Sequence, residues 1–153
     1  MTDILNEKSL TMYELFHDAS KSPDPVEFIK MHMKKDSRII QVLGYAMNPS
    51  FKMGIPEGTP PYIPSDVPLG LAEIELLHLA QKLYILYDTK APKAKREIML
   101  IQWMEKMAQV EAEMLILIKD KMLHTMFPEV TEDVLLKAIG WDRAMYDKLK
   151  AKC

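Results

Sequence analysis

Features that crosslink a chain or anchor it in a membrane are scarce in this sequence. Its one cysteine, Cys153, stands at the last position, so no intrachain disulfide can form and a reducing compartment is expected. No apolar run approaches the roughly 20 residues that cross a bilayer, and the first ten residues lack the basic region and the apolar run of a signal peptide. The sequence therefore predicts a cytoplasmic protein without a membrane partner.

An excess of positive charge is also missing. The chain has 20 basic and 22 acidic residues and a formal net charge of −2, which does not provide the basic surface typical of nucleic-acid-binding proteins. Locally the balance differs, because Lys93, Lys95 and Arg96 stand together after Pro92. We interpret this basic cluster as the solvated start of a helix and keep phosphate contacts as the alternative.

Catalytic and metal-binding motifs are absent from the sequence. The histidines lie far apart and form no HExxH or i, i+4 pair, and no phosphate-binding glycine loop or GxSxG motif occurs. The carboxylates of Glu73 and Glu75, like those of Glu111 and Glu113, are two residues apart, so on a helix they point in different directions. We interpret them as surface charge. The sequence predicts no enzyme, no cofactor, no metal site and no small-molecule substrate.

The prolines of the chain are concentrated in one segment. Six of its ten prolines fall in residues 48–68, a segment that we call the proline strap. Proline fixes φ, lacks an N–H donor and keeps the preceding residue out of the α region, so this segment cannot be a helix or a central strand. Its apolar side chains are too many for a flexible linker, and they are Phe51, Met53, Ile55, Tyr62, Ile63 and Val67. We predict an ordered, extended strap that lies across helices and buries these side chains as anchors.

Two further features of the strap bear on its shape and use. Gly54 and Gly58 are predicted to turn the chain around Pro56. An ordered loop of about twenty residues in a compact domain is often functional. Pro61, Tyr62 and Pro64 are therefore candidate partner-binding residues within a recognition peptide for an aromatic groove. The structural alternative is that they only anchor the strap.

Helical patterns flank the strap on both sides, and we assign all 153 residues to one domain with residues 1–47 before the strap and 69–153 after it. The predicted helices are Asp3–Ala19 with a restart near Ser9, Pro25–Met33 behind Asp24, Ile39–Met47 behind Asp36 or Ser37, Leu69–Tyr87, Pro92–Ala108, Gln109–Leu123, Glu132–Ile139 between Thr131 and Gly140, and Trp141–Lys150. Leu69–Tyr87 is the expected central packing helix, and the 13 methionines are interpreted mainly as core residues. The predicted fold is all-α, a bundle of seven or eight helices with a long, ordered, proline-rich loop between its halves.

Four blocks between Met47 and Trp141 carry a resemblance, and they read MNPSFKMGIPEGTPPYIPSD, KREIMLIQWMEKM, EAEMLILIKDKML and VTEDVLLKAIGW. They resemble successive blocks of an uncharacterised family of small proteins encoded by T4-like tailed bacteriophages, with an EGTPPY-type strap as the most specific motif. The chain departs from that pattern at His124, where a turn with proline is expected, and at Gly140, where the pattern ends in Pro-Gly. The resemblance implies a viral protein of the host cytoplasm or the virion, and it brings no activity with it.

The block from Glu111 to Gly140 is similar to part of the helical DNA-binding domain of ATP-dependent DNA ligases. It combines a helix that ends in a basic KDK segment, a turn and a short capped helix. The similarity implies contacts with duplex DNA phosphates from Lys93, Lys95, Arg96, Lys119, Lys121 and Lys137. Such contacts position a protein on DNA without reading its sequence.

Three functions are consistent with these observations. The first is a non-enzymatic phage accessory protein that binds a protein of the host or phage replication or transcription machinery, through the strap or a methionine-rich helix face. The second is a helical module that binds double-stranded DNA, and the third is a virion or assembly component. The near-neutral charge favours the first, because phosphate binding draws on a surplus of basic residues.

Overall fold

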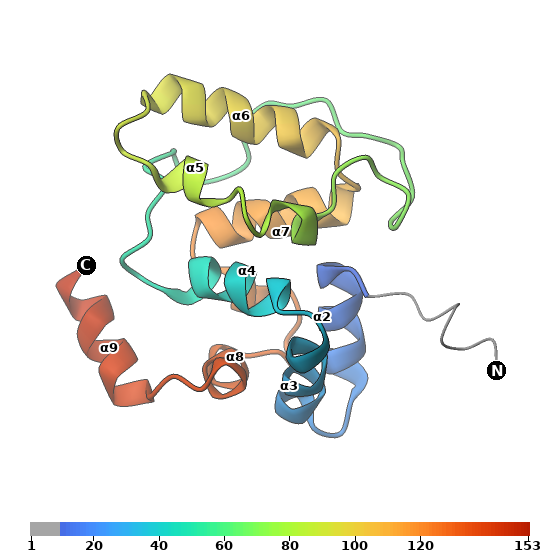
Figure 1. Cartoon of the computed structure of the whole chain (residues 1–153), viewed down its shortest axis with the longest axis vertical. Coiled ribbons are helices and arrows are strands. Elements are labelled where there is room, and N and C mark those ends of the chain that lie inside the picture. The colour runs from blue at the N-terminus through green and yellow to red at the C-terminus, as the bar shows by residue number, and fades with distance from the viewer. Residues whose placement is uncertain (1–9) are drawn as a thin grey trace.

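The computed structural model describes residues 10–153, and within them the chain folds into eight α-helices and two short 3-10 helices (Figure 1). The elements are α2 (Met12–Lys21), α3 (Pro25–Lys35), α4 (Arg38–Met47), η1 (Leu76–Leu79), α5 (Tyr84–Tyr87), α6 (Lys93–Glu105), α7 (Gln109–Lys119), η2 (Leu123–Thr125), α8 (Glu132–Ile139) and α9 (Arg143–Lys152). Among the described residues, β-type pairing is limited to one isolated parallel bridge between Ser65 and Ala108. The predicted all-α class is confirmed, and the start of the first predicted helix lies outside the described residues.

Capping residues set several helix ends where the sequence predicts them. Asp24 accepts a hydrogen bond from the N–H of Glu27 at the start of α3, and Thr131 accepts one from Val134 at the start of α8. Helix α8 ends at Gly140, whose φ of 78° is the left-handed conformation that glycine adopts without strain. These short-range signals confirm the predicted bounds of α8.

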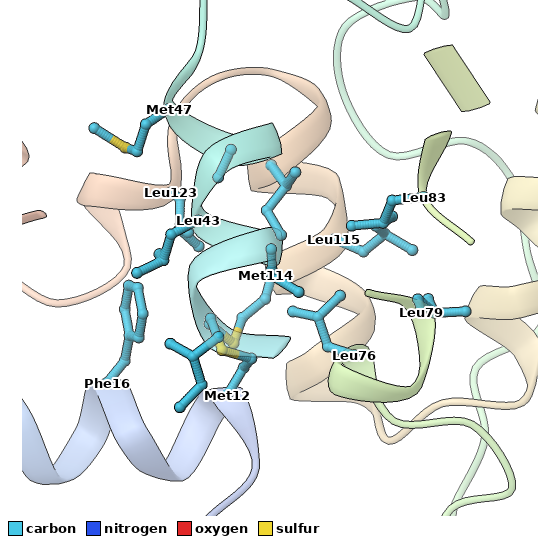
Figure 2. Close-up of a cluster of buried hydrophobic side chains, with 14 of the residues drawn as sticks. Met12, Phe16, Leu43, Met47, Leu76, Leu79, Leu83, Met114, Leu115 and Leu123 are labelled. Carbon is cyan, nitrogen blue, oxygen red and sulfur yellow. The ribbon is translucent and has the colours of Figure 1, made fainter. Parts of the chain in front are cut away.

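Helix α7 is the centre of the packing, because it contacts α2, α4, α6, η1 and η2. Figure 2 shows its Met114 and Leu115 among side chains from the elements around it, with Phe16 of α2 and Leu43 of α4 close by. The buried apolar side chains form one cluster. Five of the other helices described in residues 10–153 therefore pack against α7, and the strap crosses the outer side of that assembly.

The predicted central helix Leu69–Tyr87 is wrong, since the structure has only η1 and the single-turn helix α5 in this segment. Gly70 has a φ of 91°, which breaks a helix at its start. The N–H of Ile74 donates to the carbonyl of Lys106 at 3.2 Å, and the N–H of Leu76 donates to the Glu111 carboxylate at 2.8 Å. Because these donors have partners outside the segment, its leucines reach the core without a continuous helix.

Smaller departures lie at helix ends and on helix faces. Helices α6 and α7 end before the predicted Ala108 and Leu123. On α6, Ile98 is 54% exposed. Methionine is a core residue at several positions, as predicted, and the buried ones are Met12, Met47, Met53, Met104, Met107 and Met114. No helix within residues 10–153 is both long and apolar enough to cross a membrane.

Candidate functional site

The proline strap lies along the antiparallel pair α6 and α7, as predicted for an ordered strap. In Figure 1 it leaves the end of α4, passes behind α6, and reaches the end of α6 that joins α7. Residues 53–58 contact the first turn of α6 and the last turn of α7, and residues 63–65 contact the opposite ends of both helices. The strap therefore spans the full length of the helix pair.

Arg96 holds the first part of the strap. Its side chain is buried and donates hydrogen bonds to the carbonyls of Met53, Leu86 at 3.3 Å and Ala91 at 3.3 Å. Gly54 lies directly against the guanidinium with a φ of 70°, and a Cβ at that position would stand 3.6 Å from an Arg96 nitrogen. One planar side chain thus joins the strap to the end of α5 and to the turn before α6.

Lys119 and Asp120 hold the turn of the strap that the glycines were predicted to make. The Lys119 ammonium donates to the carbonyl of Pro56 at 2.7 Å and pairs with the Asp120 carboxylate at 2.5 Å. The other Asp120 oxygen accepts the N–H of Gly58 at 3.0 Å, and Gly58 has a φ of 93°. A carbonyl and an N–H of one turn are therefore bound by two adjacent side chains of opposite charge.

Lys121 holds the chain where the strap begins. It is the second residue after α7 and has a φ of 60°, and the N–H of Met122 closes the turn by donating to the carbonyl of Leu117 at 2.8 Å. The Lys121 ammonium donates to the carbonyl of Tyr45 at 2.6 Å and lies 5.6 Å from the centre of the Tyr87 ring. Burial lowers the pKa of Lys121 to about 8.

The lowered pKa of Lys121 gives a pH dependence with a defined sign. Between pH 8 and about 10.4, the usual lysine pKa, the unfolded chain binds a proton at this site that the folded chain has lost, so the free energy of unfolding rises with pH. We expect urea unfolding at pH 8 and pH 9.5 to show this rise in the wild type. The Lys121→Met variant should show a clearly smaller rise, and an identical rise in both proteins would count against a buried amine.

Glu105 and Gln109 hold the far end of the strap. The Glu105 carboxylate accepts the N–H of Ile63 at 2.9 Å, and the side-chain amide of Gln109 donates to the carbonyl of Ser65 at 3.3 Å. The bridge between Ser65 and Ala108 lies beside these contacts. The backbone of residues 63–65 is therefore fixed to the turn between α6 and α7.

The side chains of the strap divide into anchors and an exposed edge. Met53 is 1% exposed and Tyr62 is half-buried, where burial and the nearby Glu113 carboxylate raise the pKa of its hydroxyl. Ile63 is 77% exposed, so its prediction as a buried anchor is wrong. It stands outside because its backbone N–H, rather than its side chain, contacts the helices. Pro61 and Pro64 on either side are exposed as well.

The six candidate phosphate-binding residues do not form one group. Arg96 and Lys119 are buried, and Lys121 is half-buried, and all three donate to backbone carbonyls. Lys93 and Lys95 are exposed on the first turn of α6. Lys137 is exposed on α8, which Figure 1 places on the side of the molecule away from α6. Three of the six candidate residues are therefore already hydrogen-bonded to carbonyls of their own chain.

Glu111 is a buried structural contact that the sequence interpretation missed. It is 1% exposed, so the interpretation as surface charge is wrong, and its carboxylate accepts the N–H groups of Leu76 at 2.8 Å and Tyr13 at 3.4 Å. Burial raises the pKa of Glu111, and these hydrogen bonds oppose the rise. The spacing to Leu115 and Ile118 on the buried face of α7 is the signal that places it inside. Glu113 is exposed, as predicted.

Comparison with known proteins gives a family without an assigned function. No curated protein and no solved structure matches the chain. Within residues 10–153, no group of three histidine, cysteine, aspartate or glutamate side chains is arranged to hold a metal ion. A family model described as "Family of unknown function (DUF6433)" matches residues 12–125, which contain the strap and the side chains of Arg96, Glu105, Gln109, Lys119 and Asp120 that hold it. The chain belongs to this family of unknown function.

Proposed function

We propose that the protein is a non-enzymatic accessory protein that binds a protein partner through the exposed edge of the proline strap, residues 61–64. The proposal rests on the backbone and the side chain of Ile63. Its N–H donates to the Glu105 carboxylate at 2.9 Å, while its side chain is 77% exposed. The flanking Pro61 and Pro64 are exposed and conformationally restricted. An apolar side chain is thus presented from a fixed backbone.

A fixed backbone favours binding because less conformational entropy is lost when the partner docks. Arg96 and the Lys119–Asp120 pair hold the strap before this edge, and Gln109 holds it just after. The half-buried ring of Tyr62 adds an aromatic surface with a polar tip, a combination common at protein interfaces. The exposed methionines Met31, Met122 and Met145 lie on separate parts of the chain, which favours the strap over a methionine-rich face.

The source of the partner follows from the resemblance to small proteins of T4-like phages. We propose a protein of the host or phage replication or transcription machinery in an infected bacterial cell. Double-stranded DNA is the less favoured ligand, since Arg96, Lys119 and Lys121 donate to carbonyls of their own chain. The exposed Lys93, Lys95 and Lys137 remain for phosphate contacts, and they lie on two separate helices.

The test uses the tagged full chain to capture proteins from extracts of phage-infected cells. Ile63→Asp places a charge on the proposed edge and is expected to reduce the captured partner about tenfold, as for a central interface residue. Leu71→Asp is the matched control, because Leu71 is 71% exposed and lies outside the strap. Both variants should retain the wild-type melting temperature within a few degrees.

Equal capture by Ile63→Asp and the wild type would reject the strap edge as the binding surface. A second arm tests DNA with a 20-base-pair duplex at low and moderate salt. Binding that weakens steeply with salt and is lost in a Lys93→Glu/Lys95→Glu variant would favour the DNA-binding alternative, since phosphate contacts release counterions. We expect no such salt-dependent complex.

A further inference from the structure

A groove lies beside α9, the last helix of the chain. Its volume is about 610 Å³, within the range of pockets that bind ligands or side chains. Its apolar lining comes from Trp141 before α9 and from Met145 and Leu149 on the helix, and Asn48 at the end of α4 faces them. Met145 is 71% exposed, so the apolar surface is open to a partner.

Side chains along one face of α9 hold this helix against α8. Arg143 lies 2.8 Å and Lys150 3.6 Å from the Glu132 carboxylate of α8, and the Tyr146 hydroxyl donates to the same group at 3.2 Å. Burial would raise the pKa of Glu132, but Lys150, Tyr146 and Arg143 outweigh it and hold the pKa below its usual value. Glu132 thereby sets how α9 is rotated about its axis.

Another face of α9 lines the groove. Met145, Lys148, Leu149 and Lys152 stand at i, i+3, i+4 and i+7, so they share one face of the helix. At its far end α9 meets the start of the strap, where the Lys52 ammonium donates to the carbonyl of Cys153 at 2.9 Å. The groove-lining face is therefore held at both ends.

The charge at the groove is unbalanced. Two lysines, Lys148 and Lys152, line it with one carboxylate, Asp142, which accepts the N–H of Met145 at 3.1 Å. Neither lysine forms an ion pair with a carboxylate among residues 10–153. Their ammonium groups flank the apolar side chains of Met145 and Leu149. An occupant that matches this surface carries apolar anchors next to carboxylates.

We propose that this groove binds a short, acidic, amphipathic helix of a partner protein. The lining face extends about 10 Å along α9 at 1.5 Å per residue, which corresponds to two turns of a bound helix. A hollow of this size accepts side chains, whereas a bilayer surface is flat. The α9 helix of a second copy is basic and would be repelled. This surface is separate from the strap edge, and apart from Asn48 its lining residues lie outside residues 12–125 that match the family.

The probe is a fluorescein-labelled helical peptide of 14 residues with leucines at i, i+3, i+4 and i+7 and glutamates on the flanks. Fluorescence anisotropy with the full chain should give saturable binding. Lys148→Glu/Lys152→Glu is expected to weaken it at least about tenfold, because two attractive contacts become repulsive. Lys93→Glu/Lys95→Glu is the matched control and should bind like the wild type. In NMR spectra the Trp141 indole signal should shift on addition of the peptide.

Several results would overturn the proposal. They are no saturable binding up to about 1 mM peptide, equal loss in both double variants, undiminished binding by a peptide with alanine in place of the leucines, and an unshifted Trp141 indole. Sedimentation of the protein with vesicles of 3:1 phosphatidylcholine and phosphatidylserine, without peptide binding, would identify a membrane surface instead. Because Ile63→Asp leaves the groove intact, failure of the strap proposal and failure of this one are distinguishable.

Discussion

Replacing Glu111 by glutamine is expected to lower the free energy of unfolding by about 2–3 kcal/mol, because a buried donor left without an acceptor costs about 1–3 kcal/mol. Both carboxylate oxygens of Glu111 accept backbone N–H groups, from Leu76 at 2.8 Å and from Tyr13 at 3.4 Å. A glutamine offers one acceptor oxygen, and its NH₂ group then faces the second donor. Urea unfolding followed by far-UV circular dichroism at neutral pH measures the difference.

The matched control is Glu113→Gln on the same helix. Glu113 is exposed, so this change should alter the free energy of unfolding by less than about 0.5 kcal/mol. Glu111 joins three elements that are distant in sequence, namely α2, η1 and α7. If the two variants unfolded at the same urea concentration, Glu111 would not have the anchoring role that its contacts indicate.

Replacing Arg96 by methionine is expected to destabilise the protein by about 3 kcal/mol or more, since hydrogen bonds from a charged group contribute about 1.5–3 kcal/mol each. The change leaves the carbonyls of Met53, Leu86 and Ala91 without this donor. Arg96→Lys should recover only part of the loss, because the three donors of an ammonium group sit on one nitrogen and cannot reach three carbonyls that the wider guanidinium spans.

Limited proteolysis adds a local readout for Arg96. Release of Met53 should expose the strap, so Arg96→Met is expected to be cut within residues 48–68 faster than the wild type under conditions that leave the helices folded. Lys95→Met, at an exposed position next to Arg96, is the control and should be cut at the wild-type rate. Cleavage of the strap at equal rates in all three proteins would show that Arg96 does not secure it.

Both ends of α8 were predictable because their causes are local. Thr131 and Gly140 act on backbone groups within four residues, so the chain around them carries the whole signal. Leu69–Tyr87 was not predictable in the same way. Its leucines match a helical stripe, yet the groups that shape the segment, Lys106 and Glu111, lie some thirty residues further along the chain.

The sequence predicts the strap as an ordered element, but it does not predict the side chains that bind the strap to the helices. Arg96 was interpreted from its charge as part of a solvated helix start, and Lys119 was interpreted from the ligase resemblance as a phosphate contact, and both interpretations place the side chain in solvent. Helical spacing held the missing information, since Arg96 shares the buried face of α6 with Leu100 and Met104. The EGTPPY and KDK blocks, which stand apart in sequence, meet where Lys119 and Asp120 bind Pro56 and Gly58. The exposed position of Ile63 goes with the contact of its N–H with Glu105, 42 residues further along the chain, and has no local signal.

Hydrogen exchange of the strap amides tests most directly whether residues 48–68 form a fixed ribbon on α6 and α7. The N–H groups of Gly58 and Ile63 are bound by Asp120 and Glu105, so we expect both to exchange far more slowly than an unstructured peptide. In Asp120→Ala the N–H of Gly58 should lose this protection while the helices keep theirs. Exchange of Gly58 and Ile63 at the rates of a free peptide in the wild type would contradict a clamped strap.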